Sequence, residues 1–302
     1  MTELNSAAVA NVNELKPTKS NRVWEIDFLR GVCIILMVFD HIMWQIHDFI
    51  WRYFDIGSWS NPSIPTFLVN YHNFGSFYYL NNFRIVFRTM VLFLFFFISG
   101  ISINFSKNNA KRGCLCLGCG IIITIITSIL CACKVTNIQD HLIMFGVLSC
   151  LGSSILITYF LRKLVYKLTN NNLKIWIGVA FVLSWVLILL GKYFEKEFPY
   201  YYIQTSSPLS WFRAITGNIL GFSRFGGDYF PLVPYLAYMI IGCVIGEIVY
   251  KNKESLFKKQ PKWCIPFSYV GKKTLWIYLL HIPIITLIHA IIFLACGFHI
   301  TF

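Results

Sequence analysis

The chain has 302 residues, of which 57% are hydrophobic and only 13% are charged, and its formal net charge at pH 7 is +13. A soluble protein carries about twice this charged fraction, so the composition excludes a water-soluble domain. A basic balance is also typical of nucleic-acid-binding proteins, but here the lysines and arginines lie in short loops between apolar runs. We therefore expect an all-α, polytopic helical bundle in a lipid bilayer, without a nucleic-acid partner.

Residues 1–22 are polar and contain neither an apolar core nor a cleavage-like site, so we expect a disordered cytoplasmic tail there. The rest of the chain, 23–302, forms the predicted transmembrane domain. Its apolar runs predict about seven spans. They lie at residues 24–49, 83–105, 113–133, 141–161, 173–191, 229–250 and 274–297.

The distribution of basic residues predicts how these spans are oriented. With the N-terminus in the cytoplasm, 17 of the 26 lysines and arginines fall in cytoplasmic segments and eight fall outside, while Arg30 lies within the first span. The positive-inside rule then places the N-terminus inside and the C-terminus outside. The sequence contains no visible internal repeat, which disfavours the inverted-repeat design common among transporters.

The first span carries ionisable residues on one face. At 100° per residue, Asp27, Arg30 and His41 lie within about 60° of one another, and Gln45 follows on the same stripe if the helix continues. Arg30 and His41 are about 16 Å apart along the helix, roughly half the hydrocarbon thickness. Ionisable groups at such depth are costly and usually functional. A neutral imidazole there can act as a general base or become acylated.

Arg30 lies at the cytoplasmic mouth of this span. Its planar guanidinium suits a phosphate or carboxylate, which it can bind with two parallel hydrogen bonds. The structural alternative is that Arg30 snorkels to the surface and pairs with Asp27.

Two aromatic-rich segments, 50–82 and 192–228, lie outside between the spans. They form either an interfacial aromatic belt or a platform for a sugar acceptor. Arg88, at the outer mouth of the second span, and Asp228, just before the sixth, are candidate acceptor-binding residues. Asp228 could instead cap the helix that begins at the following prolines.

The last span contains a second histidine, His281, about 10 Å from its cytoplasmic end. Tyr278 lies one turn below it on the same face, whereas His289 is about 80° away and is expected to pack. Before this span, Lys272 and Lys273 belong to a lysine-rich cytoplasmic segment. Its lysines are orientation signals that would also attract a polyanionic cosubstrate.

The ten cysteines invite a metal or disulfide interpretation. Most of them lie in or at the ends of spans, and their spacing puts few of them on one helix face. We expect small apolar packing residues and no metal site.

Four motifs lie in or at the ends of the predicted spans. They are Glu25-Ile-Asp27-Phe-Leu-Arg30-Gly31 followed by Met37-Val38 and His41, Phe96-Phe-Ile-Ser99-Gly100-Ile, Asp228-Tyr-Phe-Pro231-Leu-Val-Pro234, and Ile277-Tyr278-Leu-Leu-His281-Ile-Pro283. Together they resemble the catalytic domain of the heparan-α-glucosaminide N-acetyltransferase family in its bacterial form. The resemblance covers about residues 22 to 290, and the Arg-x10-His spacing is also similar to membrane acyltransferase family 3. Met144 and Ser149 stand where such proteins often carry an arginine and a histidine, and Gln45 where an acidic residue is common.

The resemblance implies transfer of acetyl from cytoplasmic acetyl-CoA, a cosubstrate and not a tightly bound cofactor, to an amino or hydroxyl group of an extracytoplasmic sugar or glycan. It also implies a bacterial plasma membrane. The expected residues are His41, His281 and Asp27 for the chemistry, Arg30, Tyr278, Lys272 and Lys273 for the donor, and Asp228, Gln45 and Arg88 for the acceptor.

Two other functions compete with this one. A proton-coupled transporter or channel would use Asp27, Arg30, His41 and His281 as a relay. A seven-helix receptor fits less well, because its N-terminus would lie outside. The acceptor and the oligomeric state stay open, and an oligomer is possible.

Overall fold

The computed structural model describes residues 23–301 apart from 134–140, 199–206, 225 and 258. The predicted tail, residues 1–22, lies outside the described residues. All regular structure in the described part is helical, and Phe54 and Ile300 add one isolated β-bridge, so the all-α prediction is confirmed. The helices are α1 Trp24–Trp44, α2 Thr66–Tyr79, α3 Asn82–Ile101, α4 Asn109–Ala132, α6 Val147–Leu168, α7 Leu173–Glu197, α8 Pro208–Leu220, α9 Leu232–Val249, α10 Cys264–Lys272 and α11 Thr274–Ala295.

Six of the described helices are long and apolar enough to cross a membrane. They are α3 with its 3₁₀ extension to Asn104, α4, α6, α7, α9 and α11. The predicted first span corresponds to α1, which has 21 residues but also four charged side chains, and therefore lies outside that apolar class.

Helix α1 nevertheless runs along the full length of a membrane-length helix. Asp40 near its end pairs with Arg84 at the start of α3, and Arg30 near its beginning contacts Ser102 just after α3. The two helices are therefore antiparallel neighbours over the same depth. The predicted first span thus takes the form of a helix as deep as α3, and its charged side chains pair with or are covered by neighbouring segments.

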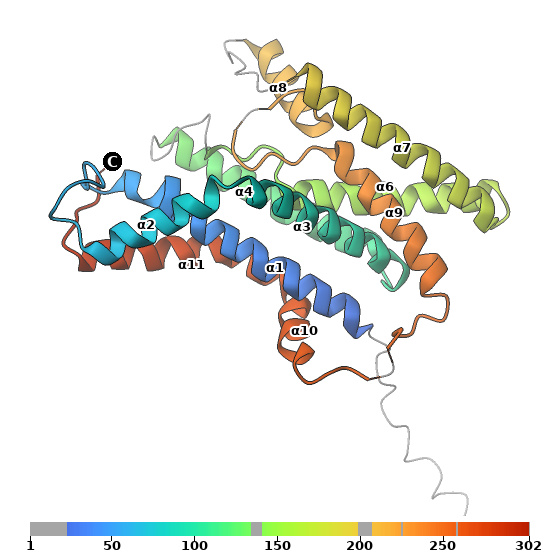
Figure 1. The fold of residues 1–302 in the computed structure, drawn as a ribbon. Coiled ribbons are helices and arrows are strands. Elements are labelled where there is room, and N and C mark those ends of the chain that lie inside the picture. The colour runs from blue at the N-terminus through green and yellow to red at the C-terminus, as the bar shows by residue number, and fades with distance from the viewer. Residues whose placement is uncertain (1–22, 134–140, 199–206, 225, 258, 302) are drawn as a thin grey trace, which may run out of the picture.

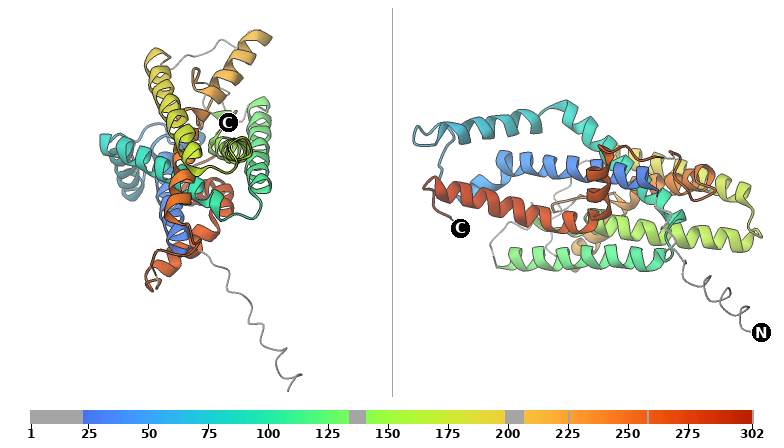
Figure 2. Two further views of the ribbon diagram at one scale, coloured as in Figure 1. Left: turned by 90° about the vertical axis from the view of Figure 1, so that its right-hand side faces the viewer. Right: turned by 90° about the horizontal axis from the view of Figure 1, so that it is seen from below.

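Helices α1 and α11 lie side by side and parallel (Figure 1), since His41 contacts His281 and, further on, Gln45 contacts Thr286. Parallel first and last spans are what seven alternating crossings require. In the right view of Figure 2, the axes of α1, α4, α6 and α11 are roughly aligned, and α6 runs antiparallel to α4, since Gly113 contacts Leu156 and Gly120 contacts Ser149. We call the end of the bundle where α1 begins the proximal end, and the opposite one the distal end.

At the proximal end, α10 crosses α1 at very short range. A Cβ atom added to Gly31 would lie 1.9 Å from the carbonyl oxygen of Phe267, and one added to Gly271 would lie 1.8 Å from that of Asp27. Only glycine permits this approach, as in small-residue contacts between membrane helices. The contact fixes the α10–α11 junction next to the start of α1.

Two irregular segments meet inside the bundle, before α6 and before α9. The Gly227 N–H donates to the carbonyl of Leu142 at 2.9 Å, and the Phe230 N–H donates to that of Phe145 at 3.4 Å. Phe145 and Phe230 are buried. Non-helical backbone in a membrane protein is tolerated where protein covers it or where it lines a cavity. This junction brings Asp228 to the interior.

The Asp40–Arg84 pair supplies a stability prediction. Both Arg84 donors, at 2.7 and 2.9 Å, bond the Asp40 carboxylate, and these side chains are 11% and 14% exposed. Asp40→Asn leaves the arginine without its counter-charge and should lower the free energy of unfolding by about 2–3 kcal/mol. Thermal unfolding in detergent measures this.

The matched control is Asp48→Asn, because Asp48 also pairs with an arginine, Arg52, but the two side chains are 42% and 50% exposed. Its cost should stay below about 1 kcal/mol. Equal losses in the two variants would show that the Asp40 pair contributes nothing beyond a surface contact.

Candidate functional site

His41 of α1 and His281 of α11 are in direct contact. Their ring centroids are 4.9 Å apart and the ring planes meet at 79°. His281 is only 6% exposed and His41 is partly buried. Two imidazoles that are separated by 240 positions in the chain therefore share one place in the bundle interior.

Backbone carbonyls fix the tautomer of both rings. Nδ1 of His41 lies 2.8 Å from the carbonyl oxygen of Met37, and Nδ1 of His281 lies 2.6 Å from that of Tyr278. A carbonyl can only accept, so Nδ1 carries the proton in each ring and Nε2 keeps a free lone pair when the ring is neutral. Nε2 of His281 is buried and has no hydrogen-bond partner within the described residues. The site thus presents basic nitrogens with their orientation already set.

Asp228 lies beside these histidines. Its Oδ2 accepts from the Tyr278 hydroxyl and from the Val147 N–H, both at 3.4 Å. Asp228 does not cap α9, whose N-cap is Pro231 without a side-chain hydrogen bond. It instead faces the first residue of α6, where the helix dipole favours a negative charge.

Burial raises the pKa of Asp228, although the nearby His41, the Val147 N–H, Arg88 and the Tyr278 hydroxyl each lower it. When the pKa of a carboxyl is higher in the folded than in the unfolded state, the folded state is favoured at low pH. Its stability falls as the pH rises from the unfolded-state pKa through the folded-state pKa. Asp228→Asn should therefore unfold at a higher temperature than the native protein at neutral pH. The difference should shrink as the pH falls, which thermal unfolding over a pH series would reveal. A difference that is constant with pH would contradict this.

Tyr278 connects Asp228 to His281. Its hydroxyl donates to Asp228, and its carbonyl accepts from His281. The sequence associates Tyr278 with the donor, but in the structure both of its polar groups serve the aspartate and the histidine.

Arg30 and Asp27 pair at 3.2 Å, as the structural alternative predicts, and Arg30 also donates to the Ser102 hydroxyl. Asp27 is about 21 Å from His41 along α1, and this separation is incompatible with a direct part in chemistry at the histidines. Asp27 lies beside the Arg30 guanidinium and away from the histidine pair.

Gln45 is fully buried and is hydrogen-bonded at both ends of its amide. Its Nε2 donates to Thr286 at 2.7 Å, and its Oε1 lies 2.9 Å from Nδ1 of His289. Tyr71 bonds the other nitrogen of His289 at 3.0 Å. These groups satisfy one another, so Gln45 has no free polar atom for an acceptor, and His289 packs as expected.

The remaining predicted residues lie in two separate places. The Arg88 guanidinium carbon is 5.9 Å from the centroid of the Phe230 ring, next to Asp228. Lys272 and Lys273 are exposed at the α10–α11 junction, at the proximal end. Ser149, one of the departures from the family pattern, packs against Gly120 of α4.

Arg112 is a residue that sequence reasoning did not place in the site. It lies in the first turn of α4 and donates to the carbonyls of Ser99 and Ser102, at 3.1 and 3.3 Å. Ser102 also binds Arg30. In the sequence, Arg112 is one of several basic residues of a short loop between apolar runs, and no spacing distinguishes it.

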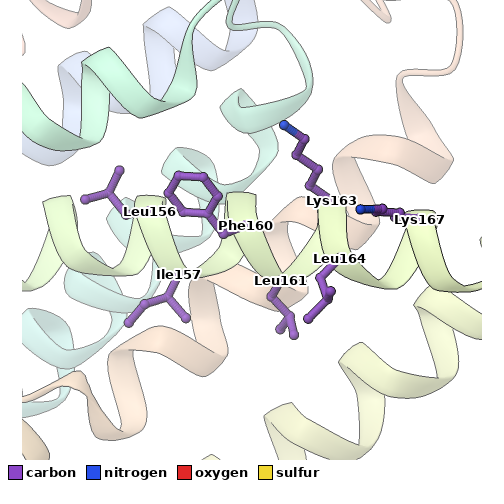
Figure 3. Close-up of a pocket in the computed structure, with 7 residues that line it drawn as sticks. All are labelled: Leu156, Ile157, Phe160, Leu161, Lys163, Leu164 and Lys167. Carbon is purple, nitrogen blue, oxygen red and sulfur yellow. The ribbon is translucent and has the colours of Figure 1, made fainter.

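An open hollow of about 630 Å³ lies elsewhere, on the side of α6 (Figure 3). No histidine lines it, and its wall is apolar apart from two lysines at one edge. It is therefore not the candidate site. The lining residues are Leu156, Ile157, Phe160, Leu161, Lys163, Leu164 and Lys167.

Of three comparisons with known proteins, one found a match. No curated protein and no solved structure matches the chain. The family model described as heparan-alpha-glucosaminide N-acetyltransferase, catalytic, matches residues 22–61 and 64–283. These ranges include His41, Asp228, Tyr278 and His281. The chain belongs to the family of the heparan-alpha-glucosaminide N-acetyltransferase catalytic domain.

Proposed function

We propose that this membrane protein transfers acetyl from cytoplasmic acetyl-CoA to an amino or hydroxyl group of a sugar or glycan on the other side of the bilayer. Membership of the acetyltransferase family and the six apolar helices support a membrane-embedded transferase. The observation that carries the proposal is the histidine pair, whose Nδ1 protons are held by carbonyls so that Nε2 is left as a base.

The chemistry starts at Nε2 of His41. In direct transfer, His41 takes the proton of the acceptor as its nitrogen or oxygen attacks the thioester carbonyl. The C–S bond breaks, and the sulfur of CoA leaves and receives that proton. In the alternative, Nε2 attacks the thioester carbonyl first, the C–S bond breaks and CoA leaves as its thiolate, which gives an acyl-imidazolium with Nδ1 still protonated. The acceptor then attacks this acyl group, the N–C bond to the imidazole breaks, and the proton of the acceptor goes to the CoA thiolate. His281 supports the charge that develops on His41 in either route.

The donor would enter at the proximal end. Arg30, Lys272 and Lys273 lie there and would bind its phosphates, because guanidinium and ammonium groups complement phosphate charge. The pantetheine arm would then run about 16 Å along α1 to His41. The proximal end is the cytoplasmic one under the positive-inside rule, which puts the N-terminus inside and the C-terminus outside a bacterial plasma membrane.

The acceptor would enter from the distal end. Asp228, beside the histidine pair, and Arg88, next to Asp228, would offer a carboxylate and a guanidinium for its hydroxyl groups. The aromatic segment that contains α2 would supply stacking faces.

The experiment is a sidedness assay in sealed vesicles. Labelled acetyl-CoA is placed on the side of the N-terminal tail and glucosamine on the other side, then the reverse. We expect labelled acetyl-glucosamine in the first arrangement alone. Substrate flux into liposomes without acyl-CoA, with no acetylated product, would refute the transferase and favour the transporter.

A further inference from the structure

We propose that Arg30 and Arg112 together form a binding site for a phosphate or pyrophosphate group, at the proximal end of α1, α3 and α4. The identification of its ligand as the donor CoA rests on the proposed function. The site itself rests on the contacts and charges of the described residues.

The two guanidinium groups meet at Ser102. Arg30 donates to its hydroxyl, and Arg112 donates to its carbonyl at 3.3 Å. The residues come from different helices, α1 and α4, and the end of α3 lies between them. Two cations that share one serine are close enough to bind a single anion together.

The charges of this group do not cancel. Asp27 pairs with Arg30, whereas the contacts of Arg112 in the described part of the chain are with backbone carbonyls. A carbonyl at a helix end carries only a fraction of a negative charge. Among the described residues, no carboxylate therefore pairs with Arg112, and a positive charge in a partly buried place is costly without an anion.

The alternative to a phosphate site is a purely structural role, in which Arg112 caps the carbonyl groups at the end of α3. That role needs hydrogen-bond donors but no charge, and an uncharged amide could fill it. A nearby pair shows the difference: Arg162 on α6 also lies near the proximal end, but Glu247 neutralises it at 2.9 Å. Arg112 has no such carboxylate among the described residues.

The place of the group also fits a long donor molecule. It lies at the proximal end, next to the lysines of the α10–α11 junction and about 16 Å along α1 from His41. A molecule with phosphates at one end and a thioester at the other could occupy both positions.

The test compares Arg112→Gln with Lys111→Gln. The glutamine at 112 keeps a donor for the α3 carbonyls, and the control removes the same charge from an exposed neighbour on the same turn. Binding of CoA, inorganic pyrophosphate and pantetheine to the purified full chain is measured without turnover. We expect Arg112→Gln to lower the affinity for CoA and for pyrophosphate about 10- to 100-fold and to leave the affinity for pantetheine unchanged. Lys111→Gln should leave all three affinities unchanged.

Equal effects in the two variants, or CoA binding that is unaffected by Arg112→Gln, would overturn the proposal. If Arg112→Gln does not fold, Arg112→Lys is used instead, because it keeps the positive charge but loses the planar guanidinium. Its affinity for pyrophosphate should fall less than tenfold. A lipid headgroup is the other possible source of phosphate, and the binding assay is therefore repeated in nanodiscs of phosphatidylglycerol and of phosphatidylcholine. If the site binds phosphatidylglycerol headgroups but neither CoA nor pyrophosphate, it is not a donor site. Arg112-dependent pyrophosphate binding in a protein that transfers no acetyl would uphold this site while the proposed function fails.

Discussion

Replacing His41 with glutamine is expected to reduce acetyl transfer about 10²- to 10⁴-fold, the usual contribution of a general base. Glutamine is polar and of similar size, but its amide cannot take a proton from the acceptor or carry an acyl group. The variant should express and unfold like the native protein, because His41 bonds only the carbonyl of Met37 on its own helix. The measurement is the transfer of labelled acetyl at matched protein levels.

His299→Gln is the control for this experiment. His299 lies near the C-terminus, and its backbone N–H bonds Asp55, far along the chain from the histidine pair. Its replacement should leave the rate unchanged. A His41→Gln variant with the native rate would remove His41 from the chemistry.

The second large effect is expected for His281→Gln. This ring contacts His41, and its buried Nε2 has no partner in the described part of the chain, which is costly unless substrate or a charged neighbour uses it. We expect a loss of about 10²-fold or more, because the ring that supports the charge on His41 is gone.

The double variant His41→Gln with His281→Gln distinguishes a joint role from two separate ones. Residues that act as a unit are non-additive, so the double variant should be about as slow as the slower single one. Losses that multiply would show that the two rings act independently.

The sequence predicted the helical class and six apolar spans and singled out the two histidines, because apolar length and costly intramembrane groups are local signals. It could not predict that the two rings touch, since that depends on how α11 packs beside α1 after α10 has crossed α1 at Gly31 and Gly271. Helical periodicity put Asp27 on the same face as His41 correctly. Asp27 is nevertheless about 21 Å from His41 along the helix axis, and it lies next to Arg30 instead.

Other residues were hidden for similar reasons. The helix that begins with α1 continues as a π-helix over Gln45–Phe49. Gln45 still faces α11, as His41 does, but its partners Thr286 and His289 are set by the packing of the two helices and not by local sequence. Arg112 acquires its position only when α4 packs beside the end of α3, and nothing in its local sequence distinguishes it from a loop lysine.

The most direct measurement is a cryo-electron microscopy map of the full chain in a lipid nanodisc with acetyl-CoA. The account predicts donor phosphates between Arg30 and Arg112, a pantetheine arm along α1, and the thioester beside Nε2 of His41. Density for the donor at the hollow on α6, or with its thioester away from the histidine pair, would contradict it.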